Sequence, residues 1–231
     1  MKIMTFNTQH CLNFIERRID FDVMAKAIAE CDADVVGLNE MRDGSNPPEF
    51  DAQCRILSEK SEIGDYYFAK ALTFKEGEYG NGLLSRAKIV SAETIDVPDP
   101  EVRGYDGYYE HRVLLKAKLE NGLTVMVIHF GLNPDEAENA VRTVVENLES
   151  EKCILMGDFN LCPDDKILLP IRERMKDTAT LFGGEKLSFP SDCPTQKIDY
   201  IFVSHDIDVV SADIPAIVAS DHRPCVAEIK F

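Results

Sequence analysis

The sequence predicts an α/β fold in which two β-sheets pack together and helices cover their outer faces. Strand-like and helix-like segments alternate along the chain, which is typical of α/β proteins. Hairpin-like strand pairs interrupt that alternation in the middle of the chain, which disfavours a simple doubly wound sheet. The sequence contains no internal repeat, low-complexity stretch or flexible linker. We therefore expect a single domain over residues 1–231.

The N-terminal part predicts two strands and two helices. These elements are a strand at 2–8, a helix at 20–31, a strand at 35–38, a loop at 41–49 and a helix near 50–61. The first strand ends at Asn7, and Asp20 or Asp22 can cap the first helix. The second strand is wholly apolar, as expected for a strand buried on both faces, and is predicted to stop at Glu40.

The middle of the chain predicts five strands, at 66–73, 81–85, 88–96, 111–119 and 123–130. Asn121-Gly122, between the last two, is a strong signal for a two-residue hairpin turn. Residues 97–110 are rich in Pro, Gly, Asp and Tyr and form the longest connection. Loops of that length in compact domains are more often functional than idle, and these tyrosines could close over a compact substrate or stack on a base.

The C-terminal part predicts one long helix and three strands. The helix spans 135–149, a buried strand at 153–156 ends at Gly157-Asp158, and further strands lie near 198–203 and 224–230. Together with the hairpins, this order favours two packed sheets with helices outside.

The formal net charge of −16, from 41 acidic and 25 basic residues, argues against broad electrostatic capture of nucleic acid. Proteins that hold DNA through its phosphates present many Lys and Arg side chains and release counterions. A local basic patch remains compatible with the charge, so nucleic acid is disfavoured as a partner without being excluded.

The location of the protein is predicted from three absences in the sequence. No apolar run approaches the roughly 20 residues that a membrane span needs. The N-terminus lacks a signal-peptide pattern. The seven cysteines are scattered and never spaced as C-x-x-C, which disfavours a zinc site or a disulfide framework. We therefore expect a cytoplasmic protein, with the oligomeric state left open.

Side chains that bind metals or transfer protons recur where the predicted strands end. They are Asn7, Glu40, His129, Asp158 with Asn160, Asp199, and the pair Asp221-His222 before the last strand. Strand ends are rigid positions from which side chains can converge on one cleft. Each group alone fits a turn, a cap or a structural role. The whole set indicates a catalytic site.

These residues stand in short motifs whose order resembles the endonuclease/exonuclease/phosphatase superfamily. The motifs are TFN ending at Asn7, GLNE ending at Glu40, VIHFG around His129, GDFN at 157–160, KIDYIFVS at 197–204 and SDHRP at 220–224. GDFN and SDH are individually unspecific, but the full ordered set is specific. The resemblance covers the chain from Asn7 to Pro224.

The resemblance implies a four-layer α/β sandwich, with two mixed, mainly antiparallel sheets packed face to face and the site between them. It also implies a catalytic Mg²⁺ or Mn²⁺ held by the hard carboxylate of Glu40, with Asn7 and Asp221 beside it.

The same resemblance implies roles for five catalytic residues. Asp158 and Asn160 would orient the attacking water and the phosphoryl oxygens. His222 would act as general base with its ring held by Asp199. His129 would stabilise or protonate the leaving oxygen.

Three further residues are candidates for substrate binding. Tyr79 stands where abasic-site exonucleases carry a phosphate-contacting tyrosine, and Asn81 resembles a residue of the sphingomyelinase-like branch. Arg112 resembles an arginine that meets the substrate phosphate in deoxyribonucleases. A half-buried strand tyrosine and a strand arginine paired with a neighbour are the structural alternatives.

The predicted function is hydrolysis of a phosphate ester, with a small-molecule or head-group phosphodiester favoured. The chain resembles small bacterial members related to sphingomyelinases and deoxyribonucleases. It has no Trp to serve as a wedge or stacking platform on DNA. A metal-dependent nuclease is the alternative activity. A non-catalytic binding protein with the same fold is less favoured, because the motif set is complete.

Overall fold

The computed structural model describes residues 1–44, 50–75 and 77–231, which form two six-stranded sheets. The first sheet contains, in spatial order, β11 (Asp208–Asp213), β12 (Cys225–Lys230), β1 (Lys2–Asn7), β2 (Val35–Asp43), β4 (Gly77–Ser85) and β3 (Asp65–Phe74). The second contains β5 (Ile89–Val97), β6 (Arg112–Leu119), β7 (Thr124–His129), β8 (Cys153–Asp158), β10 (Asp199–Val203) and β9 (Lys176–Asp177).

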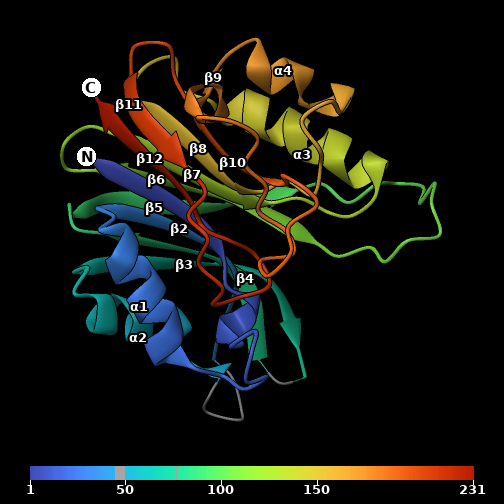
Figure 1. Cartoon of the computed structure of the whole chain (residues 1–231). Coiled ribbons are helices and arrows are strands. Elements are labelled where there is room, and N and C mark those ends of the chain that lie inside the picture. The colour runs from blue at the N-terminus through green and yellow to red at the C-terminus, as the bar shows by residue number, and fades with distance from the viewer. Residues whose placement is uncertain (45–49, 76) are drawn as a thin grey trace.

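Helices cover the outer faces of both sheets. They are α1 (Phe21–Cys31), α2 (Gln53–Ser61), α3 (Pro134–Asn147) and α4 (Leu169–Arg172), with the short 3₁₀ turns η1 (Gln9–Cys11), η3 (Lys166–Leu168) and η4 (Thr178–Leu181). Figure 1 shows α1 and α2 on one side of the paired sheets and α3 and α4 on the other. No helix in the described part of the chain is long and apolar enough to cross a membrane.

The four layers are held by three apolar clusters. Residues such as Ile3, Leu83 and Met156 fill the space between the two sheets. A second cluster lies between the first sheet and α1 with α2, and a third lies between the second sheet and α3 with α4. Among the described strands, β1–β2 and β7–β8 are the only parallel pairs. The predicted four-layer sandwich of mixed, mainly antiparallel sheets is confirmed.

The helix ends follow the local sequence. Asp20 accepts hydrogen bonds from the backbone N–H groups of Asp22 and Val23, which caps α1 as one of the two predicted alternatives. Asn133 and Glu136 form a capping box at α3, where Pro134 occupies the first turn and needs no hydrogen-bond donor.

Two details of the strand and turn predictions are wrong, namely the end of β2 and the length of the hairpin loop before β7. β2 does not stop at Glu40, because a bulge in its pairing with β4 places that residue at φ 62° and the strand continues to Asp43. Residues 45–49 of the predicted loop lie outside the described residues. The hairpin before β7 closes through a bond from the Leu119 N–H to the Leu123 carbonyl, so its loop is longer than two residues, with Gly122 at φ 86°.

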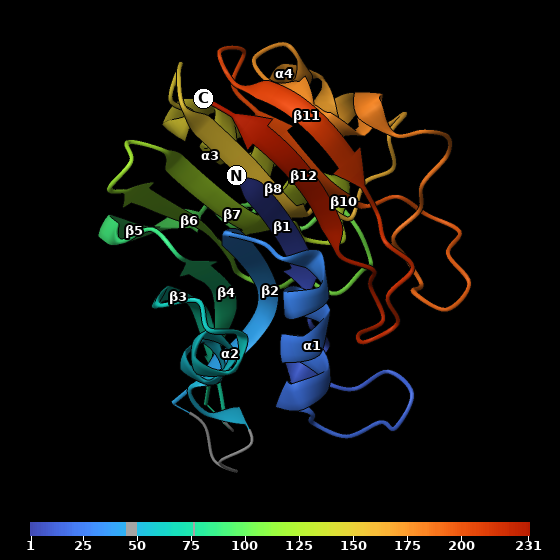
Figure 2. The same ribbon diagram turned by 60° about the vertical axis from the view of Figure 1, so that its left-hand side comes forward.

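Two strand positions also differ from the prediction. β11 is an edge strand beside β12 that the sequence did not indicate (Figure 2). Asp199 begins β10 instead of ending a strand. Because β10 runs antiparallel to β8, with Asp199 opposite Asp158, its first residue still lies at the same sheet edge as the end of β8.

Gly80 allows β3 and β4 to approach closely. A Cβ atom on Gly80 would lie 1.9 Å from the carbonyl oxygen of Ala69, a backbone atom that cannot move without disturbing the sheet. We expect Gly80→Ala to lower the free energy of unfolding by roughly 2–3 kcal/mol, measured by urea denaturation. The matched control is Gly64→Ala, since no atom of the other described residues lies within 4 Å of that Cβ. Equal stability of the two variants would contradict this packing.

Candidate active site

Asn7 joins the two sheets at the edge where the candidate residues gather. Its Nδ2 donates to Glu40 Oε1 at 3.1 Å and to Asp158 Oδ2 at 3.0 Å. Glu40 belongs to the first sheet and Asp158 ends β8 in the second. One amide group therefore holds two carboxylates from opposite sheets beside each other.

Asp158 faces both candidate imidazoles. Its Oδ2 lies 3.5 Å from His129 Nε2 and 3.6 Å from His222 Nε2, while its Oδ1 accepts a 2.9 Å hydrogen bond from the Asn160 N–H. Burial raises the pKa of Asp158 to about 6, against the opposing effects of His222, Asn160 and Asn7. The carboxylate is thus a shared negative centre between the two rings.

His222 forms a tight pair with Asp199. His222 Nδ1 lies 2.9 Å from Asp199 Oδ2, and both side chains are almost fully buried. Burial by itself would lower the pKa of His222, but the charges of Asp199 and Asp158 raise it to about 10. The bond to Asp199 fixes the ring and directs Nε2 towards Asp158.

His129 is held in one tautomer by Arg112. A guanidinium can only donate, so the 3.2 Å contact from Arg112 makes His129 Nδ1 an acceptor and leaves the proton on Nε2. Burial, with the charge of Arg112, lowers the pKa of His129 well below its usual value. His129 is therefore a neutral donor. Asn160 Nδ2 lies 3.3 Å from the same Nε2, so two N–H groups point to one region.

Arg112 is in turn fixed by Glu110 and Tyr79. Its Nη1 lies 2.5 Å from Glu110 Oε1, and the Tyr79 hydroxyl contacts both the guanidinium and the carboxylate. Tyr79 and Arg112 both line the pocket described below. Glu110, which the sequence analysis did not single out, precedes Arg112 by two residues.

Asn81 is not among the described residues that line the active-site pocket. Its side chain is buried, with Oδ1 accepting from Asn39 Nδ2 at 2.9 Å and Nδ2 donating to the Val113 carbonyl at 3.0 Å. Asn39 also donates to the Ile128 carbonyl and accepts from the Asp158 N–H, at 2.9 and 3.0 Å. Both asparagines therefore bridge the two sheets just behind the site.

The pocket over these groups has a volume of about 360 Å³. The described residues that line it are His10, Glu40, Arg42, Phe74, Tyr79, Tyr108, Glu110, Arg112, His129, Leu132, Asp158, Asn160 and His222. Of the tyrosines in the 97–110 loop, only Tyr108 reaches it. Asp221 accepts a hydrogen bond from the Ser220 hydroxyl at 2.9 Å, and its charge acts on Glu40 from outside the lining.

Besides Glu110, the sequence analysis missed four lining residues, His10, Arg42, Phe74 and Leu132. Arg42 follows Glu40 by two positions in β2, so a prediction that continued the strand would have placed it on this face. His10 lies in the η1 turn, where residues 9–11 all have positive φ, and its Nδ1 is 4.0 Å from Glu40 Oε2. No periodic sequence signal indicates such a left-handed turn.

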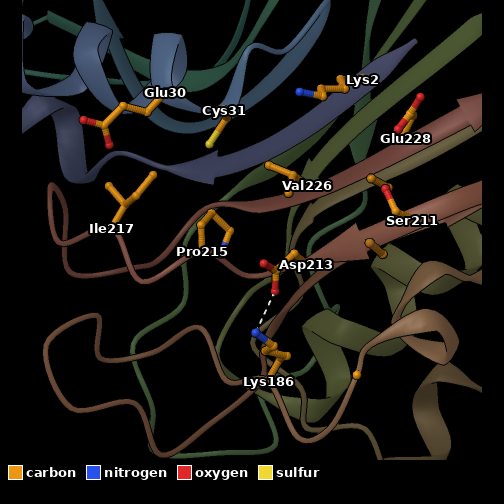
Figure 3. A pocket seen from close by; sticks show the side chains of 13 residues that line it. Lys2, Glu30, Cys31, Lys186, Ser211, Asp213, Pro215, Ile217, Val226 and Glu228 are labelled. Carbon is orange, nitrogen blue, oxygen red and sulfur yellow. Dashed lines mark ion pairs between the residues drawn. The ribbon is translucent and has the colours of Figure 1, made fainter.

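A larger cavity, of about 590 Å³, lies far from this chemistry on the outer side of β11 and β12 (Figure 3). Its lining mixes apolar residues such as Val226 and Ile217 with a Lys186–Asp213 ion pair of 2.8 Å. None of the catalytic candidates lines it. Size alone therefore does not identify the functional pocket.

The donor atoms at the Asn7 edge fit a hard divalent cation. Burial raises the pKa of Glu40 to about 7, and the neighbouring charges of Asp221 and Asp158 act in the same direction. Asp199 Oδ1 is buried and has no hydrogen-bond partner in the described structure. Asp158, Asp199 and His222 also bring ligand atoms within 4.8 Å of one another. Clustered carboxylate oxygens with uncompensated negative charge are the donors that hard divalent cations prefer.

Two packed six-stranded sheets, with carboxylates and imidazoles gathered at one edge, define an α/β sandwich of the endonuclease/exonuclease/phosphatase class. The chain matches the Endonuclease/Exonuclease/phosphatase family over residues 4–222 and belongs to it. The family predicted from the ordered motifs is confirmed.

Known relatives are distant but similar over the whole chain. The uncharacterized protein YbhP of Escherichia coli K12 is 24% identical, over 99% of this chain and 95% of the relative. A mannosyl-6-phosphatase of Bacteroides thetaiotaomicron, Bt3783, is 19% identical with a TM-score of 0.79, covering 100% of both chains. A family protein of Beutenbergia cavernae is 21% identical with a TM-score of 0.78, covering 100% of this chain and 71% of that one. At these identities the solved structures support the fold.

The charge at Glu40 leads to a stability prediction. Its folded pKa of about 7 exceeds the ordinary value of 4.5, so the carboxylate lowers stability progressively as the pH rises through that window. We expect Glu40→Gln, which keeps the acceptor for Asn7, to stabilise the metal-free protein at pH 8 by about 1–2 kcal/mol. Thermal denaturation of both proteins, first with chelator and then with Mg²⁺, measures the metal-free stability and the effect of the cation. The Mg²⁺-induced rise in Tm should shrink in the variant.

The matched control is Glu146→Gln on the exposed face of α3, which should leave both values unchanged. A Glu40→Gln protein with lower metal-free stability and a full Mg²⁺ response would rule out Glu40 as a cation ligand.

Proposed function

We propose that this protein is a divalent-metal-dependent phosphoesterase that hydrolyses a small phosphate ester, with a phosphodiester favoured. The observation that carries the proposal is the Asp158 carboxylate between two imidazoles of opposite character. His222 is paired with a buried aspartate, and His129 is held neutral by Arg112. The structurally similar Bt3783 of Bacteroides thetaiotaomicron is a mannosyl-6-phosphatase, which supports phosphate-ester hydrolysis as the proposed activity.

Each group has a distinct part in the proposed reaction. His222, oriented by Asp199, takes the proton of the attacking water, and Asp158 orients that water. His129 Nε2–H donates to a phosphoryl or leaving oxygen. Asn160 Nδ2, 3.3 Å from Nε2, donates one hydrogen to the Phe130 carbonyl at 3.1 Å and has a second hydrogen for the same substrate oxygen. This assigns His129 to stabilising the oxygen, the first of its two predicted roles.

Glu40, with Asn7 and Asp221 beside it, would hold the cation, and Asp158 faces the same amide of Asn7. A bound Mg²⁺ or Mn²⁺ would polarise the phosphoryl group and oppose the negative charge that keeps His222 protonated. Arg112 lines the same pocket and would donate to a second phosphoryl oxygen. Tyr79 steadies the guanidinium of Arg112.

The charge of the protein favours a small substrate over a polynucleotide. A groove that follows a nucleic-acid backbone needs several cationic contacts. The described lining of the pocket contributes two arginines, and one of them is already paired with Glu110. With a net charge of −16, we expect weak binding to DNA in physiological salt.

A panel of phosphate esters tests the proposal. Aryl phosphodiester, aryl monoester, sugar phosphate, lipid head group, single-stranded DNA and RNA are each assayed with chelator, Mg²⁺, Mn²⁺ or Zn²⁺. We expect hydrolysis of a small ester that chelator abolishes and Mg²⁺ or Mn²⁺ restores. Full turnover in excess chelator would refute the metal dependence. Metal-dependent strand cleavage with steeply salt-sensitive DNA binding would make the protein a nuclease.

Variants of the two imidazoles test the proton-transfer roles. His222→Ala and His129→Ala should each lower kcat by roughly 10²–10⁴, the scale of a positioned acid, base or donor. Asp199→Asn should also be slow, because the amide holds the ring in the wrong state. The far-ultraviolet circular dichroism of each variant should match the parent protein. A His222→Ala enzyme with normal turnover would remove this residue as the base.

A further inference from the structure

Arg42 brings a second positive charge into the active-site pocket. It lies in β2 directly opposite Tyr79 of β4, so both side chains lie on the same face of the sheet. Its guanidinium is 5.2 Å from the ring centroid of Phe50 and 5.1 Å from that of Phe74. Arg42, Phe74 and Tyr79 line the pocket together with His10. We call these four residues the Arg42 subsite.

The two arginines of the pocket differ in their partners. Arg112 is bonded to Glu110 and His129. Arg42 has no carboxylate within ion-pair distance among residues 1–44, 50–75 and 77–231, whereas Arg112 pairs with Glu110. The Nε atoms of both arginines are buried without a hydrogen-bond partner in the described structure, so the two differ in their ion pairs and not at Nε. A buried donor that cannot lose its proton carries a desolvation cost until it meets an acceptor.

The aromatic contacts prepare Arg42 for a ligand. A guanidinium packed against aromatic rings loses few further rotamers when it binds, and its planar edge remains free to donate. The backbone N–H of Arg42 also donates to Gln53 Oε1 at 3.0 Å, which fixes the strand beneath it. The subsite is therefore built before any substrate arrives.

The two sides of the pocket carry opposite charge. Glu40 and Asp158 form the side that attracts a cation, whereas Arg42 stands among His10, Phe74 and Tyr79. Glu110 also lines the pocket and interacts electrostatically with Arg42, but its ion pair in the described structure is with Arg112. A substrate whose reacting phosphate lies at the carboxylate side would place its remote part over Arg42.

We propose that the Arg42 subsite binds a second phosphate group of the substrate, so that the preferred ligands are compact bisphosphates. This inference rests on the proposed function, since it assumes that the first phosphate occupies the carboxylate side. Planar guanidinium donors match phosphate oxygens in bidentate geometry. The subsite would favour small phosphate esters that carry a second anionic group over those that carry one.

Binding of non-hydrolysable phosphonates tests the inference without relying on turnover. Titration calorimetry with Mg²⁺ compares alkyl monophosphonates with alkane bisphosphonates of matched chain length, from ethyl to pentyl. We expect at least one bisphosphonate to bind about tenfold more tightly than its monophosphonate, the scale of one added charge-assisted hydrogen bond. A matched phosphono-carboxylate tests whether a carboxylate serves equally.

Variants assign that preference to Arg42. Arg42→Met should remove the tenfold preference and leave the affinity for the monophosphonate unchanged, while Arg42→Lys should keep part of it. The control is Arg55→Met on α2, an exposed arginine paired with Glu59 at 2.8 Å, which should change neither affinity. If a variant fails to fold, the titrations of the wild-type protein still test whether it prefers bisphosphonates.

Two results would overturn the subsite. One is a wild-type protein with no preference for a bisphosphonate of any length. The other is an Arg42→Met variant that weakens both ligands equally, which would make Arg42 a structural support of the pocket. If the protein hydrolyses no ester but shows a preference for bisphosphonates that depends on Arg42, the proposed phosphoesterase activity is refuted. The proposed binding role of the Arg42 subsite is then still supported.

Discussion

The site depends on hydrogen bonds that cross the interior between the two sheets. Asn39 is fully buried in β2, donates to Asn81 and the Ile128 carbonyl, and accepts from the Asp158 N–H. A buried asparagine leaves amide groups unsatisfied if its partners shift, so these bonds hold the two sheet edges in register. Asn7 adds the outer bridge between Glu40 and Asp158. Because apolar packing between sheets is non-directional, such polar bridges decide which residues meet across the gap.

Charged neighbours give the two buried histidines of the site opposite electrostatic characters. His222 lies beside two aspartates, which raise its pKa against the effect of burial, whereas burial and the charge of Arg112 together lower the pKa of His129. The two rings face one carboxylate only a few ångströms apart. A group with a raised pKa is the better proton acceptor, and a neutral ring with a lowered pKa can serve as a hydrogen-bond donor. The clustered carboxylates repel one another and are stabilised by positive charge nearby. A cation bound at the site would therefore also stabilise the folded protein.

The pocket is bounded by segments from both sheets and by the long loop after β5. Tyr109 in that loop donates to Asp135 Oδ2 at 2.7 Å, and the Tyr108 carbonyl accepts from Asn133, so the loop is tied to the start of α3. These bonds leave Tyr108 at the pocket and keep the other tyrosines away from the described lining. The size of the opening, with one arginine committed to Glu110 and another held between aromatic rings, suits a compact anionic ligand.

The sequence by itself determined the layers, most strand positions and the family, because apolar periodicity and strand-end polar motifs are local patterns. It could not place the bulge at Glu40, and so it ended β2 early and missed Arg42. It also treated Asn81 as a substrate contact, whereas the fold gives its side chain to Asn39 and the Val113 carbonyl. The tautomer of His129, the shared position of Asp158 and the left-handed turn at His10 were decided only by the tertiary structure. Each depends on partners distant in sequence, and no local pattern encodes the distance between them.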